Sequence, residues 1–407
     1  TLDTVNAGNS VLLSSAKGAI IGTGGITKIG SGTLNITGST ANTYTGTTAV
    51  NDGSMILAKT AGTDAFAGNL TIGDGTGTTA SAIVQLTNAN QIADTAAVTL
   101  DSDGQFDLND NNETVGSLAS TSSAANIDLG SGTLTTGGAN TSTNFAGTIT
   151  RTGGFTKTGT GTMTLSGTSA NTYTGATTVY DGTLTLAKTA GTNAVAGNLT
   201  IGDSAGATSS AIVQLTNANQ IADTTAVTID SDGQFNLNGK NETIGSLASA
   251  SSTANVVLSA GTLTTGGANT TTSYAGTISG TGGVTKNGTG NFTLSNNNTY
   301  TGGTTVNGGT LTLTTGGGTG AIRGDLTINS GGTVNATATD AFGYSSGSRV
   351  NTVTINGGTL TNSIPSGNGN LGWGVDYTLS DGALMSSNGG VSSTTAISNF
   401  TFGDSGS

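Results

Sequence analysis

The chain has 407 residues, with 69 glycines, one proline, no cysteine and no histidine. Its formal net charge is −12, but charged residues make up only 8% of the chain and ten of them are lysine or arginine. Ten scattered basic residues cannot assemble a groove for phosphates or a patch for anionic lipids, which argues against nucleic acid and membrane surfaces as partners. There is also no run of 18 apolar residues, so we expect no membrane insertion by this segment.

A long stretch of the sequence occurs twice and begins a third time. The pentapeptide GGITK at 24–28 returns as GGFTK at 153–157 and as GGVTK at 282–286, so 153 − 24 and 282 − 153 both equal 129. A fixed long period is typical of solenoids, in which each repeat contacts only its neighbours. It predicts these parts: the tail of a preceding unit or the N-terminal end at 1–23, units at 24–152 and 153–281, and a third unit with a divergent end at 282–407.

Alternating apolar and polar residues predict short strands along the chain. In chain order they include 54–57, 69–72, 82–87, 96–100, 105–108, 133–136, 182–186 and 310–313. Successive side chains of a strand point to opposite faces. We therefore expect burial of Met55, Leu57, Leu184, Leu186, Leu311 and Leu313, and exposure of Thr183, Thr185 and Thr312.

Many short strands alone would also fit a sandwich or a barrel. The long period favours an all-β right-handed parallel β-helix, or β-solenoid, with three tandem units of about 129 residues. One turn of such a coil takes roughly 20–25 residues, so each unit should contain about five or six turns.

Three short motifs look functional, but a structural interpretation fits each better. Residues 202–206 (GDSAG) match a nucleophile elbow and residues 403–406 (GDSG) match a serine-protease signature, yet both need a general base, usually histidine. Residues 323–325 (RGD) correspond to AGN at 67–69 and at 196–198, which lead into strands. We therefore predict no catalytic residues.

The acidic residues also look functional and also fit a structural interpretation better. Asp101, Asp103, Asp107 and Asp110 could offer oxygen ligands to Ca²⁺, but the second copy has asparagine and glycine at the last two positions. Aspartates that form turns with their own backbone are the simpler interpretation. Glu113 and Glu242 lie one period apart, too far for a glycosidase carboxylate pair. We predict no metal and no cofactor.

The third unit diverges after about Thr315 and contains the single proline, Pro365, and the single tryptophan, Trp373. A terminal repeat is expected to be atypical because it must cover an open end. The alternative is a binding patch made by Tyr344, Trp373 and Tyr377. Exposed end coils could also pair end to end with another copy.

The windows 26–57, 155–186 and 284–313 resemble the autotransporter-associated β-strand repeat. The third window shows it most clearly, in TKNGTG at 285–290, NTYTG at 298–302, TTV at 304–306 and GTL at 309–311. Residues 112–118 and 241–247 look like a companion element of the same proteins.

The resemblance implies a secreted or surface-displayed passenger β-helix of a Gram-negative-type bacterium. The expected function is a rigid extracellular stalk or spacer of an adhesin-like passenger. A host or matrix surface or a glycan is the external partner that the resemblance suggests. A self-assembling extracellular filament subunit and a β-helical carbohydrate-active enzyme are the alternatives.

Overall fold

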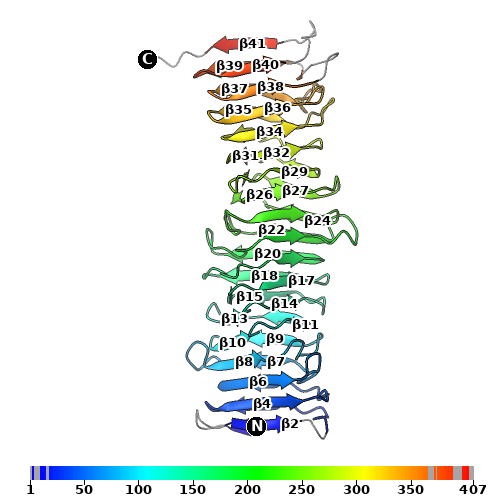
Figure 1. Cartoon of the computed structure of the whole chain (residues 1–407), viewed down its shortest axis with the longest axis vertical. Helices are drawn as coiled ribbons and strands as arrows, with labels where there is room; N and C mark the ends of the chain where they lie inside the picture. The colour runs from blue at the N-terminus through cyan, green and yellow to red at the C-terminus, as the bar shows by residue number, and fades with distance from the viewer. Residues whose placement is uncertain are drawn as a thin grey trace. The chain divides into compact units, whose positions relative to one another are not determined.

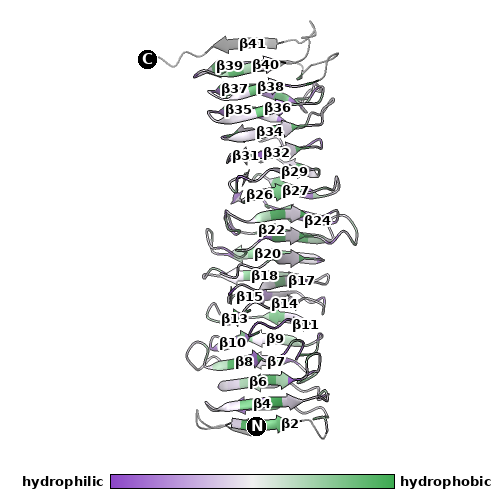
Figure 2. Ribbon diagram, in the orientation of Figure 1, coloured by the Kyte–Doolittle hydropathy of each residue, from purple (hydrophilic) through white to green (hydrophobic). Residues whose placement is uncertain are grey.

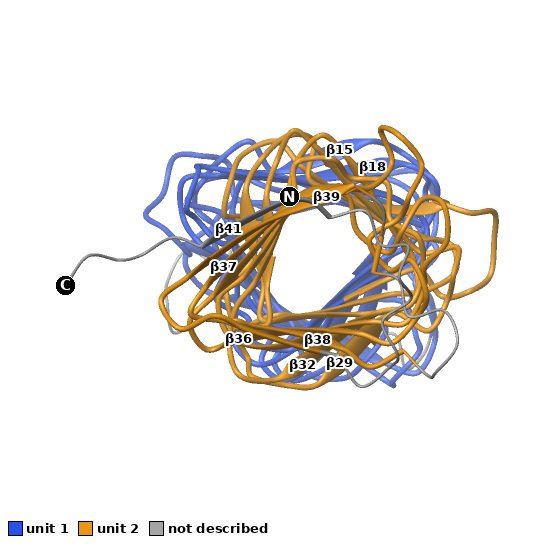
Figure 3. Cartoon of the chain, turned by 90° about the horizontal axis from the view of Figure 1, so that it is seen from above, with its two compact units in different colours: residues 1–199 blue, residues 200–407 orange. Residues whose placement is uncertain are grey.

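The computed structural model describes residues 2–3, 10–14, 18–364, 371–372, 374–387 and 397–402. The described residues form 41 strands, which divide between two compact units, residues 1–199 and residues 200–407 (Figures 1 and 3). Pro365, Trp373 and the GDSG segment lie outside the described residues.

The strands of the first unit are β1 (Leu2–Asp3), β2 (Ser10–Ser14), β3 (Ile26–Ile29), β4 (Thr33–Gly38), β5 (Thr48–Val50), β6 (Gly53–Lys59), β7 (Leu70–Ile72), β8 (Ala82–Leu86), β9 (Ala97–Leu100), β10 (Gly104–Asp107), β11 (Glu113–Val115), β12 (Ser117–Ala119), β13 (Asn126–Asp128), β14 (Thr133–Thr136), β15 (Thr143–Phe145), β16 (Thr148–Thr150), β17 (Gly154–Lys157), β18 (Thr162–Gly167), β19 (Thr177–Val179) and β20 (Gly182–Lys188).

The next strand, β21 (Leu199–Ile201), begins at the last residue of the first unit. The strands that follow are β22 (Ala211–Leu215), β23 (Ala226–Ile229), β24 (Gly233–Asn236), β25 (Glu242–Thr243), β26 (Ser246–Ala248), β27 (Asn255–Ser259), β28 (Leu263–Thr265), β29 (Thr272–Tyr274), β30 (Thr277–Gly280), β31 (Val284–Lys286), β32 (Asn291–Leu294), β33 (Thr304–Val306), β34 (Gly309–Leu313), β35 (Gly324–Asn329), β36 (Gly332–Ala336), β37 (Val350–Asn356), β38 (Thr359–Asn362), β39 (Val375–Ser380), β40 (Leu384–Ser387) and β41 (Ile397–Phe402).

Within each unit the strands stack in parallel, and each strand pairs with the strand one turn away in the chain. In unit 1 the longest sheet has the order β16-β13-β10-β8-β6-β4-β2, and in unit 2 it has the order β25-β28-β31-β33-β35-β37-β39-β41. Leu34 pairs with Met55 and Met55 with Val84, so one turn takes 21 residues and the next takes 29. This coil of parallel strands confirms the predicted all-β solenoid.

The strand pattern itself recurs. Each strand from β3 to β16 has a counterpart among β17 to β30, displaced by about 129 residues. The predicted strands are found within two residues of their expected ends, as in β7, β8, β9, β10 and β14. No helix occurs among the residues that the structure describes.

The interior of each unit is filled by alternate residues of these strands. The six predicted core residues, Met55, Leu57, Leu184, Leu186, Leu311 and Leu313, are at most 1% exposed. The threonines between them, Thr183, Thr185 and Thr312, are half-buried and not exposed, because paired strands on either side cover part of each outward side chain. Apolar and polar residues therefore share the same strands (Figure 2).

Candidate functional site

The lysine of each repeat lies in the interior, where a charge is found only if polar partners surround it. Lys157, at the end of β17, is 1% exposed. Its Nζ donates hydrogen bonds to the carbonyl oxygens of Thr158 at 2.7 Å, Gly159 at 2.7 Å and Asp181 at 3.1 Å. Thr158 and Gly159 form the turn after β17, and Asp181 belongs to the following turn of the coil. The ammonium group therefore ties two consecutive turns together.

The other repeats build the same contact. Lys28 Nζ donates to the carbonyls of Ile29, Gly30 and Asp52 at 3.3, 2.6 and 2.7 Å. Lys286 Nζ donates to those of Asn287, Gly288 and Gly308 at 2.7, 3.0 and 3.1 Å. Burial lowers the pKa of Lys157 to about 8. The signal that could have revealed this role is the recurrence of Thr-Lys before a glycine at the repeat period.

A second pair of lysines, at the ends of β6 and β20, is also buried. Lys188 Nζ donates to the carbonyls of Gly147 at 3.0 Å and Ser166 at 2.9 Å, which lie on two earlier turns. Lys59 Nζ donates to the carbonyl of Thr40 at 2.7 Å. Five of the ten basic residues of the chain are therefore buried. They are Lys28, Lys59, Lys157 and Lys188 in unit 1 and Lys286 in unit 2.

The NTYTG segment of each repeat performs a related function. In the second copy, Asn171 Oδ1 accepts a hydrogen bond from the backbone N–H of Ile149 at 3.0 Å, and its Nδ2 donates to the carbonyl of Ala194 at 2.8 Å. One amide thereby bridges the turn before and the turn after its own. The hydroxyl of Tyr173, a fully buried side chain, lies 2.5 Å from Thr177 Oγ1. Gly175 is required because a Cβ there would lie 2.2 Å from the carbonyl oxygen of Gly153.

The equivalent residues repeat these contacts. Asn42 bridges Ile20 and Ala65 at 3.0 and 2.8 Å, and Asn298 bridges Ile278 and Ala321 at 2.8 Å each. The other two tyrosine–threonine pairs are Tyr44 with Thr48 at 2.7 Å and Tyr300 with Thr304 at 2.6 Å. The lysine, asparagine, tyrosine and glycine positions of the repeat are therefore used inside the coil.

The two glutamates cap the backbone of the preceding turn. Glu113 is 1% exposed, and its carboxylate accepts from the backbone N–H groups of Gln91 at 2.7 Å, Ile92 at 3.3 Å and Thr114 at 3.2 Å. Glu242 accepts from Gln220, Ile221 and Thr243 in the same way, at 2.8, 3.4 and 3.2 Å. Burial raises the pKa of Glu113 to about 8 and that of Glu242 to about 7, although these hydrogen bonds act in the opposite direction.

These glutamates predict a pH dependence of stability. Their folded pKa values lie above the ordinary value of 4.5, so the folded protein binds more protons than the unfolded chain between pH 4.5 and 8. The free energy of unfolding should fall as pH rises through this window, by up to about 1.4 kcal/mol per pH unit for each glutamate. Melting temperatures measured from pH 5 to 8 should decrease, and the Glu113→Gln, Glu242→Gln double variant should show a flatter profile. An equal slope in the double variant would contradict the assignment.

The acidic cluster divides between a buried and an exposed part. Asp103 is fully buried, and its Oδ1 accepts from the backbone N–H of Gly75 at 2.8 Å while its Oδ2 accepts from Ser81 Oγ at 3.3 Å. Asp232 holds the corresponding loop in the second copy, through the N–H of Ser204 at 2.8 Å and Ser210 Oγ at 3.2 Å. The GDSAG segment is thus part of a loop fastened by a buried aspartate that lies 28 residues further along the chain. The predicted bonding of aspartate to its own turn is seen at Asp107, whose Oδ1 accepts from the backbone N–H of Asn109 at 2.8 Å, whereas Asp103 and Asp232 hold a more distant loop.

Chelation offers a test of the prediction that no metal is required. Among the described residues, no group of three or more carboxylates is arranged to hold an ion. EDTA should leave the circular dichroism and the melting temperature unchanged. A decrease of more than about 5 °C would instead identify an ion bound near residues 101–110.

The predicted aromatic patch is only partly described. Tyr344 is 50% exposed in the loop before β37, whereas Tyr377 on β39 is 4% exposed and belongs to the core. Trp373 lies outside the described residues. A buried tyrosine cannot contribute to a surface patch, so Tyr344 is its exposed member among the residues that the structure describes, and binding there stays a prediction.

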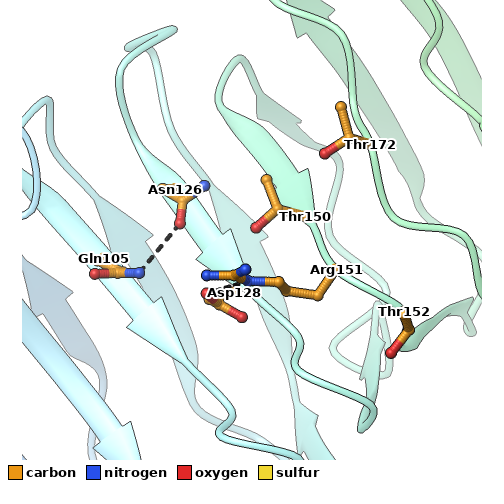
Figure 4. Close-up of a pocket in the computed structure, with 7 residues that line it drawn as sticks. All are labelled: Gln105, Asn126, Asp128, Thr150, Arg151, Thr152 and Thr172. Carbon is orange, nitrogen blue, oxygen red and sulfur yellow. Dashed lines mark hydrogen bonds and ion pairs between the residues drawn. The ribbon is translucent and has the colours of Figure 1, made fainter.

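A polar groove lies on the outer face of β10, β13 and β16 in unit 1 (Figure 4). Gln105 Nε2 donates to Asn126 Oδ1 at 3.3 Å, and Arg151 Nε donates to Asp128 Oδ2 at 2.9 Å. Thr150, Thr152 and Thr172 complete its lining, and all seven lining side chains are polar. Sequence reasoning missed this groove because its residues come from four different turns.

Comparison with known proteins identifies the repeats. The family model described as passenger-associated-transport-repeat matches residues 26–57, 155–186 and 284–313. These three windows carry the autotransporter-associated sequence pattern, and they contain the lysine, asparagine and tyrosine residues whose contacts are described above. No curated protein and no solved structure matches the chain. Over the described residues, the fold offers no helix with the length and hydrophobicity to span a bilayer. The chain is thus a β-solenoid that carries three copies of the passenger-associated transport repeat, of the kind found in autotransporter passengers.

Proposed function

We propose that the chain is a structural part of an autotransporter passenger, a rigid stalk or spacer that is secreted or displayed on the surface of a Gram-negative-type bacterium. One observation carries this proposal. The polar residues that define each repeat point inward and join consecutive turns, as Lys157 and Asn171 do. A repeated surface site would instead keep its recurring polar residues on the outside.

An enzymatic function has less support. The backbone N–H of Ser204, in the GDSAG segment, donates to Asp232 Oδ1 and so belongs to a loop held by that buried aspartate. Glu113 and Glu242 each cap a different turn of backbone. We therefore favour the scaffold over the carbohydrate-active enzyme. A filament subunit remains the alternative, and microscopy can distinguish it from a spacer.

Deletion of one full period tests the scaffold. Removing residues 153–281 joins residue 152 to residue 282, which has the same position in the repeat as residue 153. We expect this variant to fold, to melt near the temperature of the intact chain and to remain displayed when fused to a translocator. Removing residues 153–270 breaks the phase of the coil and should abolish folding and display.

Negative-stain microscopy of the same proteins should show separate elongated particles, shorter after the full-period deletion. Fibres formed by the intact chain would favour the filament subunit. Failure of the full-period deletion to fold, or display that tolerates both deletions equally, would contradict a coil whose units serve as interchangeable spacers.

A further inference from the structure

The groove of unit 1 differs from its own copy in unit 2 at three residues, and two of the differences remove a charge. At an offset of 129, Gln105, Asn126 and Thr152 keep their identities as Gln234, Asn255 and Thr281, and Thr150 becomes serine. Asp128, however, corresponds to Val257, and Arg151 corresponds to Gly280. The charged pair therefore exists in one copy only, on a coil that is otherwise repeated almost unchanged.

Arg151 occupies a backbone conformation that favours glycine. Its φ is +88°, and the equivalent positions in the other copies are Gly22 with φ +114° and Gly280 with φ +119°. A non-glycine residue in this region is strained, and such residues concentrate at functional sites. The coil does not need arginine here, because the other copies form the same turn with glycine.

The arginine is held in place but remains accessible. Asp128 Oδ2 accepts from Arg151 Nε at 2.9 Å, and Asp128 Oδ1 accepts from the backbone N–H of Gly130 at 3.0 Å, which fixes the carboxylate. The Arg151 side chain is 65% exposed and the Asp128 side chain is 15% exposed. The guanidinium therefore lies at the surface of the groove with its orientation set by the ion pair (Figure 4).

The chemistry of the lining selects a neutral ligand rich in hydroxyl groups. The groove contains amides, hydroxyls, one guanidinium and one carboxylate, and its lining has no apolar side chain that would recognise a hydrophobic peptide. Asp107 lies beside Asp128 on the adjacent strand β10, where the two residues are neighbours in the backbone register. Two carboxylates therefore lie near one guanidinium group. This balance disfavours an anionic ligand. A carboxylate and a guanidinium side by side can accept from one hydroxyl of a diol and donate to the next.

We propose that this groove binds a neutral oligosaccharide, with Asp128 and Arg151 on a vicinal diol and Gln105, Asn126 and the threonines on neighbouring hydroxyls. Successive turns supply these groups at the strand spacing of about 4.8 Å, which suits an extended chain of sugar rings lying across the strands. The site is separate from the scaffold proposed above, so either can fail without the other.

The chain supplies its own test variant. Asp128→Val with Arg151→Gly gives the two charged positions the residues of the second copy, Val257 and Gly280, which the same coil already accommodates. Binding of maltohexaose, cellohexaose and mannohexaose should be measured by calorimetry on the full chain. We expect at least one of them to bind and the double variant to bind it at least tenfold more weakly. Arg151→Gly alone should lose binding while its melting temperature stays equal or rises, because the strained φ is relieved.

A control alters two hydroxyl residues of the unit 2 copy, Ser279 and Thr281, which correspond to Thr150 and Thr152 of the groove. Ser279→Ala with Thr281→Ala should leave oligosaccharide binding unchanged. The proposal is overturned if none of the three oligosaccharides binds, if the double variant binds as well as the parent chain, or if a heparin fragment is the only carbohydrate that binds.

Discussion

Replacing Leu186 with aspartate is expected to lower the free energy of unfolding by more than about 4 kcal/mol. Leu186 is fully buried on β20 and pairs with Leu165 of the preceding turn. A carboxylate at this position would be placed among apolar side chains without a partner. Because each turn is held by its neighbours, the loss should spread beyond a single coil. Thermal unfolding followed by circular dichroism measures the effect.

Thr185→Asp is the control for this substitution. Thr185 is adjacent in the chain but points outward, where it pairs with Thr164. The same charge placed there should cost less than about 1 kcal/mol. Equal melting temperatures for the two variants would show that the assignment of inner and outer residues is wrong.

Replacing Lys157 with methionine is expected to destabilise the protein by about 3–5 kcal/mol. Methionine has nearly the same length, so the packing of the side-chain stem is kept. The carbonyls of Thr158, Gly159 and Asp181 lose their common donor, and each buried carbonyl without a partner carries a penalty. The loss outweighs the relief from having to bury an ammonium group, because three hydrogen bonds disappear together.

Lys240→Met provides the comparison, since Lys240 is half-buried in a surface turn. Its melting temperature should change by no more than a few degrees. If Lys157→Met proves as stable as the parent chain, the ammonium is not what joins these turns. Chemical-denaturant unfolding of both variants decides the matter.

The sequence by itself determined the period, the strands and the direction of their side chains. Two-residue alternation placed Leu184 and Leu186 inside, and the recurrence at 129 residues predicted a coil and not a sandwich, as the paired turns confirm. The three repeat windows could be recognised from local patterns alone. Side chains of a strand alternate between its two faces, and each repeat has the same turn residues at the same positions.

Only the tertiary structure decided what the polar residues do. The same alternation places Lys157 inward, but a charge is expected in the interior only if it has polar partners. One of these partners, the carbonyl oxygen of Asp181, comes from the next turn of the coil, so the strand pattern around Lys157 does not show it. The groove likewise joins Gln105 to Arg151 across turns that are 46 residues apart in sequence. Local patterns fix which way a side chain points, whereas the stacking of distant turns fixes what it meets. For this reason the fold was predictable from sequence. The contacts of the buried lysines, the capping of backbone N–H groups by the two glutamates and the polar groove were not.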